Sequence, residues 1–251
     1  MATDSGKRYN SVLDIIEKRL IPDEEAKKAR GEVFTPLNLV REMLFGLRKS
    51  ALDTFKRDMP DIKSKEYNKL IWGIDDEGNF KDDDETDRVG GIPLEIFRDS
   101  ESTWLDPANG IGNFPVVLFY MLDYQLNKHG KKKEFRGDDT TKRRREHIVK
   151  NMMFMIELNK GNVNTSKKIF NLIVPGVPPN VCCANTREMT DAKLKEVFGI
   201  DRFDVVMGNP PFQDFQEAEG KRGGGEPLYM KFVKKSLELL KVNHLHFHHF
   251  L

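Results

Sequence analysis

Short apolar runs alternate with helix-like segments between about residue 102 and residue 208. The apolar runs are "STWLDPA", "NMMFMIEL", "NVCCA" and "RFDVVMG", and the segments between them are "GNFPVVLFYMLDYQL", "TSKKIFNLI" and "AKLKEVFG". Strands that are apolar throughout are typical of a parallel sheet that helices cover on both faces. This order predicts a doubly wound, mostly parallel α/β fold.

The N-terminal part of the chain predicts two helices. "SVLDIIEKRL" has apolar residues at helical spacing, and "FTPLNLVREMLFGLRK" begins with Thr35 as an N-cap and Pro36 at the first helical position. The residues that follow are charged and mixed, and we assign them no chemistry. We therefore divide the chain into an N-terminal helical segment (1–50), a charged connecting region (51–101) and an α/β core (102–251).

The overall charge is close to balanced, with 41 Lys and Arg against 40 Asp and Glu. Any surface that attracts nucleic acid must therefore be local. No stretch approaches the ~20 apolar residues of a membrane span, and the N-terminus does not read as a secretory signal, so we expect a cytoplasmic protein with no membrane partner. Cys182 and Cys183 are adjacent, which provides neither a disulfide framework nor a structural metal site.

A polar segment separates the first predicted helix of the core from the second strand. Residues 127–147, "NKHGKKKEFRGDDTTKRRREH", contain two basic clusters and glycines. We interpret them as a basic insertion that is too polar to pack, and we predict a surface loop. A solvated surface is the favoured role of its cations, and contact with nucleic-acid phosphate is the alternative.

Polar residues follow the predicted strands, where a doubly wound sheet binds its ligand. Asp106 opens "DPANGIGNF", whose glycines let the backbone approach a ligand closely. The third glycine of the dinucleotide fingerprint is missing, so a pyrophosphate cradle fits poorly. Glu157 ends the second strand, where a carboxylate commonly accepts hydrogen bonds from a ribose. Asn185 follows the third strand, and its amide suits the edge of an adenine.

The fourth strand runs into Asn209, Pro210, Pro211 and Phe212. The prolines fix two φ angles, so the carbonyls of Asn209 and Pro210 form a rigid pair of acceptors. Two acceptors at about 3 Å from an exocyclic amino group would hold both of its hydrogens and aim the nitrogen lone pair at an electrophile. Phe212 offers a face for base stacking. The alternative is a simple turn, which the three other strand-end sites make less favoured.

These motifs together resemble those of S-adenosylmethionine-dependent DNA adenine-N6 methyltransferases of restriction-modification systems. "DPANGIGNF" is similar to that family's "DPAxGxGxF" loop, "IELN" to its ribose-binding strand end, and "NPPF" to its catalytic tetrapeptide. "GEVFTPLNLVREML", residues 31–44, resembles the segment that closes over the methionine part of the cofactor. The resemblance runs from about residue 30 to 240. It implies a Rossmann-like methyltransferase fold, S-adenosylmethionine as cofactor, and double-stranded DNA with a flipped adenine as substrate.

The resemblance also implies site residues, carried over position by position. The cofactor would be held by Phe34, Thr35, Pro36, Asp106, Pro107, Ala108, Gly110, Gly112, Phe114, Glu157 and Asn185. The catalytic residues would be Asn209, Pro210, Pro211 and Phe212. We interpret the glycine-rich stretch after them as a loop that closes on the flipped base, with Lys221 and Arg222 on DNA phosphate; an ordinary flexible connection is an equally good interpretation.

The C-terminal end departs from the family's pattern, which continues with three more strands and a domain that reads DNA. We therefore expect a core that is incomplete there, with an exposed sheet edge, and a missing C-terminal part or specificity subunit as partner. The tail "VNHLHFHHFL" allows a terminal strand with His244, His246 and His248 on one face, which would be a poor metal cage.

Two other functions are compatible with the same residues. A methyltransferase that acts on a protein glutamine or on RNA shares the "NPP" chemistry, because a carboxamide nitrogen also needs its lone pair aimed. The leading "GEVFTP" and Phe rather than Tyr at position 212 favour DNA. The second alternative is a truncated, catalytically silent module that only binds the cofactor.

Overall fold

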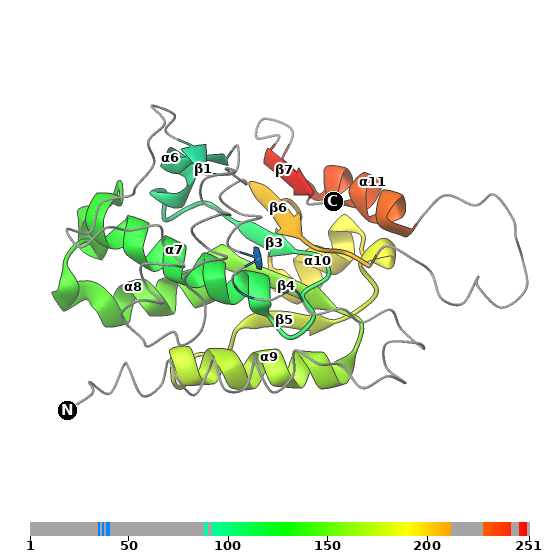
Figure 1. Ribbon diagram of the computed structural model, residues 1–251, viewed down its shortest axis with the longest axis horizontal. Helices are drawn as coiled ribbons and strands as arrows, with labels where there is room; N and C mark the ends of the chain where they lie inside the picture. Colours follow the sequence, from blue (N-terminus) through cyan, green and yellow to red (C-terminus); the bar gives the residue numbers. More distant parts are fainter. Residues whose placement is uncertain are drawn as a thin grey trace, which may run out of the picture.

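Five parallel strands form the central sheet of the protein (Figure 1). The computed structural model describes residues 35, 37, 39–40, 88–89, 92–211, 228–241 and 246–249. The strands are β3 (Trp104–Asp106), β4 (Met153–Glu157), β5 (Asn180–Cys183), β6 (Val205–Gly208) and β7 (His246–His249). They lie in the order β5-β4-β3-β6-β7, and every neighbouring pair is parallel. The predicted doubly wound, Rossmann-like α/β class is confirmed.

A helix follows each of the first four strands of this sheet. They are α7 (Asn113–His129), α9 (Lys160–Ile173), α10 (Asp191–Phe198) and α11 (Leu228–Leu239). The side chains of Asn159 and Thr190 cap α9 and α10 by accepting hydrogen bonds from backbone N–H groups of the first turn. Helices α9 and α10 therefore begin at polar capping residues, whereas α7 begins after Gly112 without a side-chain cap.

Two apolar cores lie on opposite faces of the sheet. Alternate residues of a strand point to opposite faces, and the buried residues separate in this way: Trp104 and Val205 belong to the core of α7 and α9, whereas Leu105 and Val206 belong to the core of α10 and α11. Strands β3, β4 and β6 are buried on both sides, which explains why their sequence is apolar throughout rather than alternating.

The strand order reverses between β3 and β6. From β3 the chain moves outward through β4 to β5, and it then returns to place β6 on the other side of β3. Ligands of doubly wound sheets bind beyond the carboxyl ends of the strands at such a point. The ends of β3 and β6 carry Asp106 and Asn209, so the fold brings these two predicted site residues to this position.

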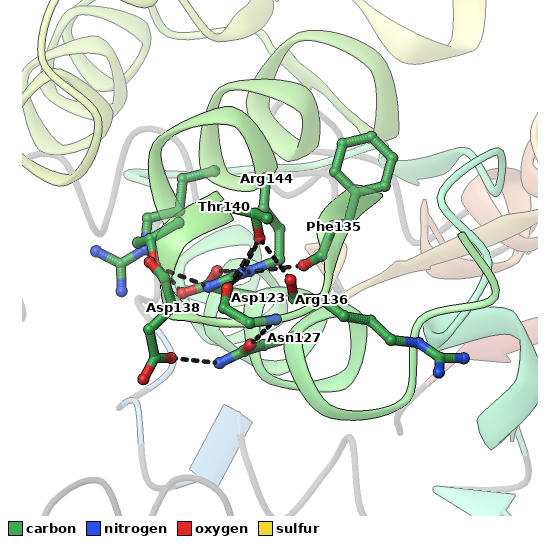
Figure 2. Close-up of polar contacts among 10 residues, drawn as sticks. Asp123, Asn127, Phe135, Arg136, Asp138, Thr140 and Arg144 are labelled. Carbon is green, nitrogen blue, oxygen red and sulfur yellow. Dashed lines mark hydrogen bonds and ion pairs between the residues drawn. The ribbon is translucent and has the colours of Figure 1, made fainter. Parts of the chain in front are cut away.

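The loop predicted over residues 127–147 is wrong, because this segment folds and packs. It contains the short helices η1 (Lys133–Phe135), η2 (Asp138–Thr140) and α8 (Thr141–His147), and the π-helix η3 (Ile148–Met152) connects it to β4. Arg144 is buried: its Nε donates to Asp123 Oδ1 at 2.6 Å, and its Nη1 donates to the carbonyls of Phe135 and Gly137 (Figure 2). A charged residue packs here because an opposite charge and several acceptors surround it.

The basic insertion lies at the end of the sheet opposite the predicted site. Lys131 N donates to the carbonyl of Arg98, and the ring of His147 lies 2.8 Å from the carbonyl of Ser100. Both carbonyls belong to the residues just before β3, at the amino ends of the strands. Two cations of the insertion, Lys131 and Lys132, pair with acidic residues of the same stretch.

The two ends of the described chain also contact the core. Leu37 and Val40 are helical and lie buried in the core beside α7, whereas the helix predicted at "SVLDIIEKRL" lies outside the described residues. Strand β7 pairs with β6 from Val205↔His246 to Gly208↔His249. A terminal strand therefore does form, as the sequence of the tail allowed, and it makes β6 an interior strand and β7 an edge of the described sheet.

None of the helices described is both long enough and apolar enough to cross a bilayer. Within the described residues, no three His, Cys, Asp or Glu side chains gather as a metal site would require.

Candidate active site

Asp106 lies buried at the carboxyl end of β3, with one carboxylate oxygen lacking any hydrogen-bond donor. Its side chain is 3% exposed, and Oδ1 accepts a hydrogen bond from the backbone N–H of Ala108 at 3.0 Å, whereas Oδ2 has no partner. Burial raises the pKa of Asp106 to about 8; the Ala108 N–H opposes this shift and the charge of Glu157 adds to it. A cation placed beside Oδ2 would favour the ionised carboxylate.

Gly208, the last residue of β6, passes very close to this carboxyl group. A Cβ atom at position 208 would lie 2.6 Å from Asp106 Oδ1 and 3.3 Å from its Cγ. These distances are shorter than ordinary van der Waals contact, so only glycine fits here. We did not single out Gly208 from the sequence, because a glycine at the end of a strand usually indicates a turn.

The loop between β3 and α7 is fixed against the end of β4. Gly112 has a φ of 103° and stands directly before α7, in a conformation that favours glycine. Gly110 N donates to Glu157 Oε2 at 2.8 Å, and Asn109 N donates to the carbonyl of Ile156 at 3.0 Å. The structure thus brings the predicted glycine loop and Glu157 together.

Glu157 is half-buried and accepts a backbone N–H on each oxygen. Besides the bond from Gly110, Oε1 accepts from Asn159 N at 2.7 Å. A carboxylate oxygen has two lone pairs and can accept more than one hydrogen bond. These bonds fix the carboxylate direction at the strand end, as a ribose acceptor requires.

Asn185 caps a short turn after β5. Its Oδ1 accepts from Arg187 N at 3.2 Å, and its Nδ2 donates to Glu188 Oε1 at 2.8 Å, at the start of η4 (Thr186–Glu188). The sequence did not predict this capping role. Thr186 ties the turn to the site by donating its hydroxyl to the carbonyl of Pro107.

Asn209 follows β6 and has one end of its amide free. Its Oδ1 is buried without a donor, and its Nδ2 donates to Thr35 Oγ1 at 3.0 Å. Pro210 is buried and Pro211 half-buried beside it. Asn113, the first residue of α7, donates from Nδ2 to the carbonyl of Thr35 at 2.6 Å. We did not single out Asn113 from the sequence, although it stands within the glycine-loop motif.

The remaining predicted residues divide into two groups. Phe114, the second residue of α7, is 4% exposed and packs in the apolar core on that face of the sheet. Ala108 is half-buried in the loop between β3 and α7. The second group lies outside the described residues: Phe34, Pro36, Phe212, Lys221, Arg222 and His244.

Buried oxygens without a donor gather at the carboxyl ends of β3 and β6. Among the described residues, four of the six buried side-chain atoms that lack a partner are oxygens of Asp106, Asn109, Asn113 and Asn209. An acceptor that is buried without a donor costs free energy. This set of oxygens therefore suits a ligand that brings N–H groups, with at least one positive charge opposite Asp106.

A family model matches the part of the chain that contains the second half of this site. Residues 125–247 match the Eco57I restriction-modification methylase family. The match spans β4, β5, β6, α11 and the strand-end residues Glu157, Asn185 and Asn209, whereas Thr35 and Asp106 precede it. It covers 123 of the 251 residues and supports a methyltransferase of a restriction-modification system. Among curated protein sequences, none matches this chain.

Several solved structures are similar at low sequence identity. A modification subunit assigned to a type I restriction enzyme of Vibrio vulnificus YJ016 is 19% identical, with a TM-score of 0.48, over 96% of this chain and 37% of its own. The DrdV-DNA complex is 14% identical (TM-score 0.46, 96% and 22%), and the type I restriction enzyme EcoKI M protein is 12% identical (TM-score 0.37, 95% and 55%). The chain thus spans well under half the length of the first two. Because all three TM-scores are below 0.5, the fold assignment rests on the strand order itself.

Proposed function

We propose that this chain transfers a methyl group from S-adenosylmethionine to the N6 amino group of adenine in double-stranded DNA, within a restriction-modification system. The observation that carries the proposal is the pair of buried oxygens without donors, Asp106 Oδ2 and Asn209 Oδ1, at adjacent strand ends. One suits an ammonium group and the other suits an exocyclic amine. The family match of residues 125–247 supports the same class of enzyme.

The residues at the strand ends fit S-adenosylmethionine chemically. Asp106 Oδ2 would accept a hydrogen bond from the α-ammonium group, and Glu157 would accept hydrogen bonds from the ribose hydroxyls. Asn185 keeps one amide hydrogen and one lone pair for an adenine edge. When bound, the cofactor would supply a methyl group activated by a positively charged sulfur.

The catalytic contribution of Asn209 and Pro210 would be alignment. The side-chain oxygen Oδ1 of Asn209 and the main-chain carbonyl oxygen of Pro210 would accept the two hydrogens of the adenine amino group. This would direct the nitrogen lone pair out of conjugation with the ring. The amino nitrogen held by Asn209 and Pro210 would receive the methyl group and give up one proton to water, and the cofactor would leave as a neutral thioether. No covalent bond to the protein forms.

The target adenine must leave the duplex to reach this buried strand end, at a cost of a few kcal/mol. Phe212 would stack on the flipped base, and Lys221 and Arg222 would contact DNA phosphate. A missing C-terminal part or a specificity subunit would supply sequence recognition.

The test is transfer of a tritiated methyl group into duplex DNA, with RNA and total protein as parallel substrates. We expect label in DNA, recovered as N6-methyladenine after digestion. Replacing Asn209 with alanine should lower transfer by at least about 100-fold, since loss of one aligned hydrogen-bonding group has effects of this size, while cofactor affinity stays within a few fold. Asn151→Ala is the matched control, because Asn151 is exposed and its amide contacts His147.

Three outcomes would count against the proposal. Label in RNA or protein but not in DNA would assign the chain to the other substrate class. Transfer that survives Asn209→Ala would remove Asn209 from the reaction. Cofactor binding without transfer to any substrate would favour the silent binding module.

A further inference from the structure

Thr35 contacts both the Asn209 side chain and the start of α7. Its hydroxyl oxygen accepts the hydrogen bond from Asn209 Nδ2 at 3.0 Å, and its carbonyl accepts that of Asn113 Nδ2 at 2.6 Å. Thr35 is 7% exposed and Asn113 is 5% exposed. Two hydrogen bonds, one buried and one partly buried, thus join Thr35 to Asn113 and Asn209, which are far from it in the sequence.

The direction of the Asn209 amide decides whether it can hold an amine. A carboxamide is almost symmetric in shape, and a half turn of its last torsion exchanges Oδ1 and Nδ2. With Oδ1 toward the substrate, the amide accepts an amine hydrogen; with Nδ2 there, two donors oppose each other. When Oδ1 faces the substrate, the Nδ2 group on the far side of the amide needs an acceptor, and in this structure the Thr35 hydroxyl oxygen accepts its hydrogen bond.

A second bond holds this partner in place. Asn113 is the first residue of α7, so its donation to the Thr35 carbonyl ties residue 35 to a helix that packs on the central sheet. The other hydrogen bond of Thr35 comes from Asn209, which directly follows β6, an interior strand paired with β3 and β7. The hydroxyl is thereby fixed relative to both strand ends that carry the site.

We propose that Thr35 is a positioning residue whose hydroxyl fixes the Asn209 amide with Oδ1 facing the substrate amine, and that Asn113 anchors Thr35 for this task. The inference rests on the proposed function of the same site. It differs from the cofactor contact that the sequence resemblance implied for Thr35, because it assigns the side chain to the substrate half of the reaction.

The kinetic test compares Thr35→Val, which removes the hydroxyl at nearly constant shape, with Thr35→Ser, which keeps it. We expect Thr35→Val to lower kcat by about 10- to 100-fold, since Asn209 Nδ2 loses its acceptor and the amide loses its fixed direction. The Kd of S-adenosylmethionine should stay within about threefold, and Thr35→Ser should recover kcat to within about threefold of the original protein. Thr35→Ala gives the same comparison if the valine variant does not fold.

Thr165→Val is the matched control. Thr165 is 5% exposed on α9, and its hydroxyl donates to the carbonyl of Gly161 at 3.0 Å, so the change also removes a buried hydroxyl but leaves Asn209 untouched. Its kcat should not change. A loss in Thr35→Ser as large as in Thr35→Val would overturn the proposal, and so would a more than tenfold weaker cofactor affinity with kcat unchanged.

A second readout does not depend on methyl transfer. In protein labelled with ¹⁵N at asparagine, the Asn209 side-chain NH₂ signal is identified by its absence in Asn209→Ala. Its hydrogen exchange should be slow in the original protein and in Thr35→Ser, and at least about tenfold faster in Thr35→Val. Equal exchange in all three would overturn the inference. Slow, Thr35-dependent exchange without any methyl transfer would instead refute the proposed function alone.

Discussion

Replacing Gly208 with alanine tests the close approach of β6 to the Asp106 carboxyl group. The added methyl carbon would lie 2.6 Å from Asp106 Oδ1, 3.3 Å from its Cγ and 3.4 Å from Pro107 Cδ. The first distance is about 0.8 Å shorter than the ~3.4 Å at which such atoms normally touch. Either β6 or the Asp106 side chain must therefore move.

The cost follows from what holds these two groups. Overpacking of this kind costs about 1–3 kcal/mol, and loss of the hydrogen bond from Ala108 N to Asp106 Oδ1 adds about 0.5–1.5 kcal/mol. The lower backbone entropy of an unfolded chain with alanine offsets about 0.5–1 kcal/mol. We expect the free energy of unfolding to fall by about 0.5–4 kcal/mol and, because Asp106 is displaced, S-adenosylmethionine affinity to fall by at least about tenfold.

The assay is urea denaturation together with calorimetric titration of the cofactor. A loss of about 2 kcal/mol lowers the urea midpoint by about 1 M. Gly161→Ala is the control: Gly161 lies in the first turn of α9, where the nearest atom to an added Cβ is the Asn159 side-chain oxygen at 3.1 Å. Its stability should stay within about 1 kcal/mol. If Gly208→Ala matched the original protein in both midpoint and affinity, the argument from the close approach would be refuted.

Three further predictions concern buried charges. Burial raises the pKa of Asp106 to about 8, so below that pH the binding of a cation must release the proton of this carboxyl group. Calorimetric titration should therefore show S-adenosylmethionine affinity rising about tenfold per pH unit from 6 to 8. The same slope in Asp106→Asn would contradict this prediction. Arg144→Ala should lower the free energy of unfolding by about 2–4 kcal/mol, because it removes a buried side chain and its hydrogen bonds to Asp123, Phe135 and Gly137, although Arg145 still pairs with Asp123. Cofactor affinity of the folded variant should hold within about twofold, and a urea-measured loss under about 1 kcal/mol would speak against this prediction. Asp204→Ala removes the acceptor of two hydrogen bonds from Thr103 and should cost about 2–3 kcal/mol in thermal unfolding; an unchanged Tm would be inconsistent with it.

The alternation of apolar runs and helix-like segments was enough to predict the parallel sheet. Strands buried on both faces must be apolar throughout, and this signal is local in the sequence. The same rule predicted that Asp106, Glu157 and Asn185 follow strands whose carboxyl ends share one edge. The position of Asn209 followed in the same way, from the apolar run before it.

The basic insertion shows where local reasoning failed. Residues 127–147 are polar in composition, so they predict a loop. In the structure, Asp123 of α7 balances the charge of Arg144, and carbonyl groups of the same segment accept further hydrogen bonds from it. Composition reports how many charges a segment contains and not whether they meet a partner. That information comes from residues that are distant in the sequence.

The sequence by itself determined the class of fold, the edge of the sheet that carries the site and the residue types available there. Only the tertiary structure decided which of them meet. Thr35 lies 174 residues before Asn209 and 78 before Asn113, and Gly208 touches Asp106 across two neighbouring strands. Hydrogen bonds and steric contacts act over a few ångströms, and at such sequence separations that distance is set by the packing of the whole sheet rather than by any local pattern.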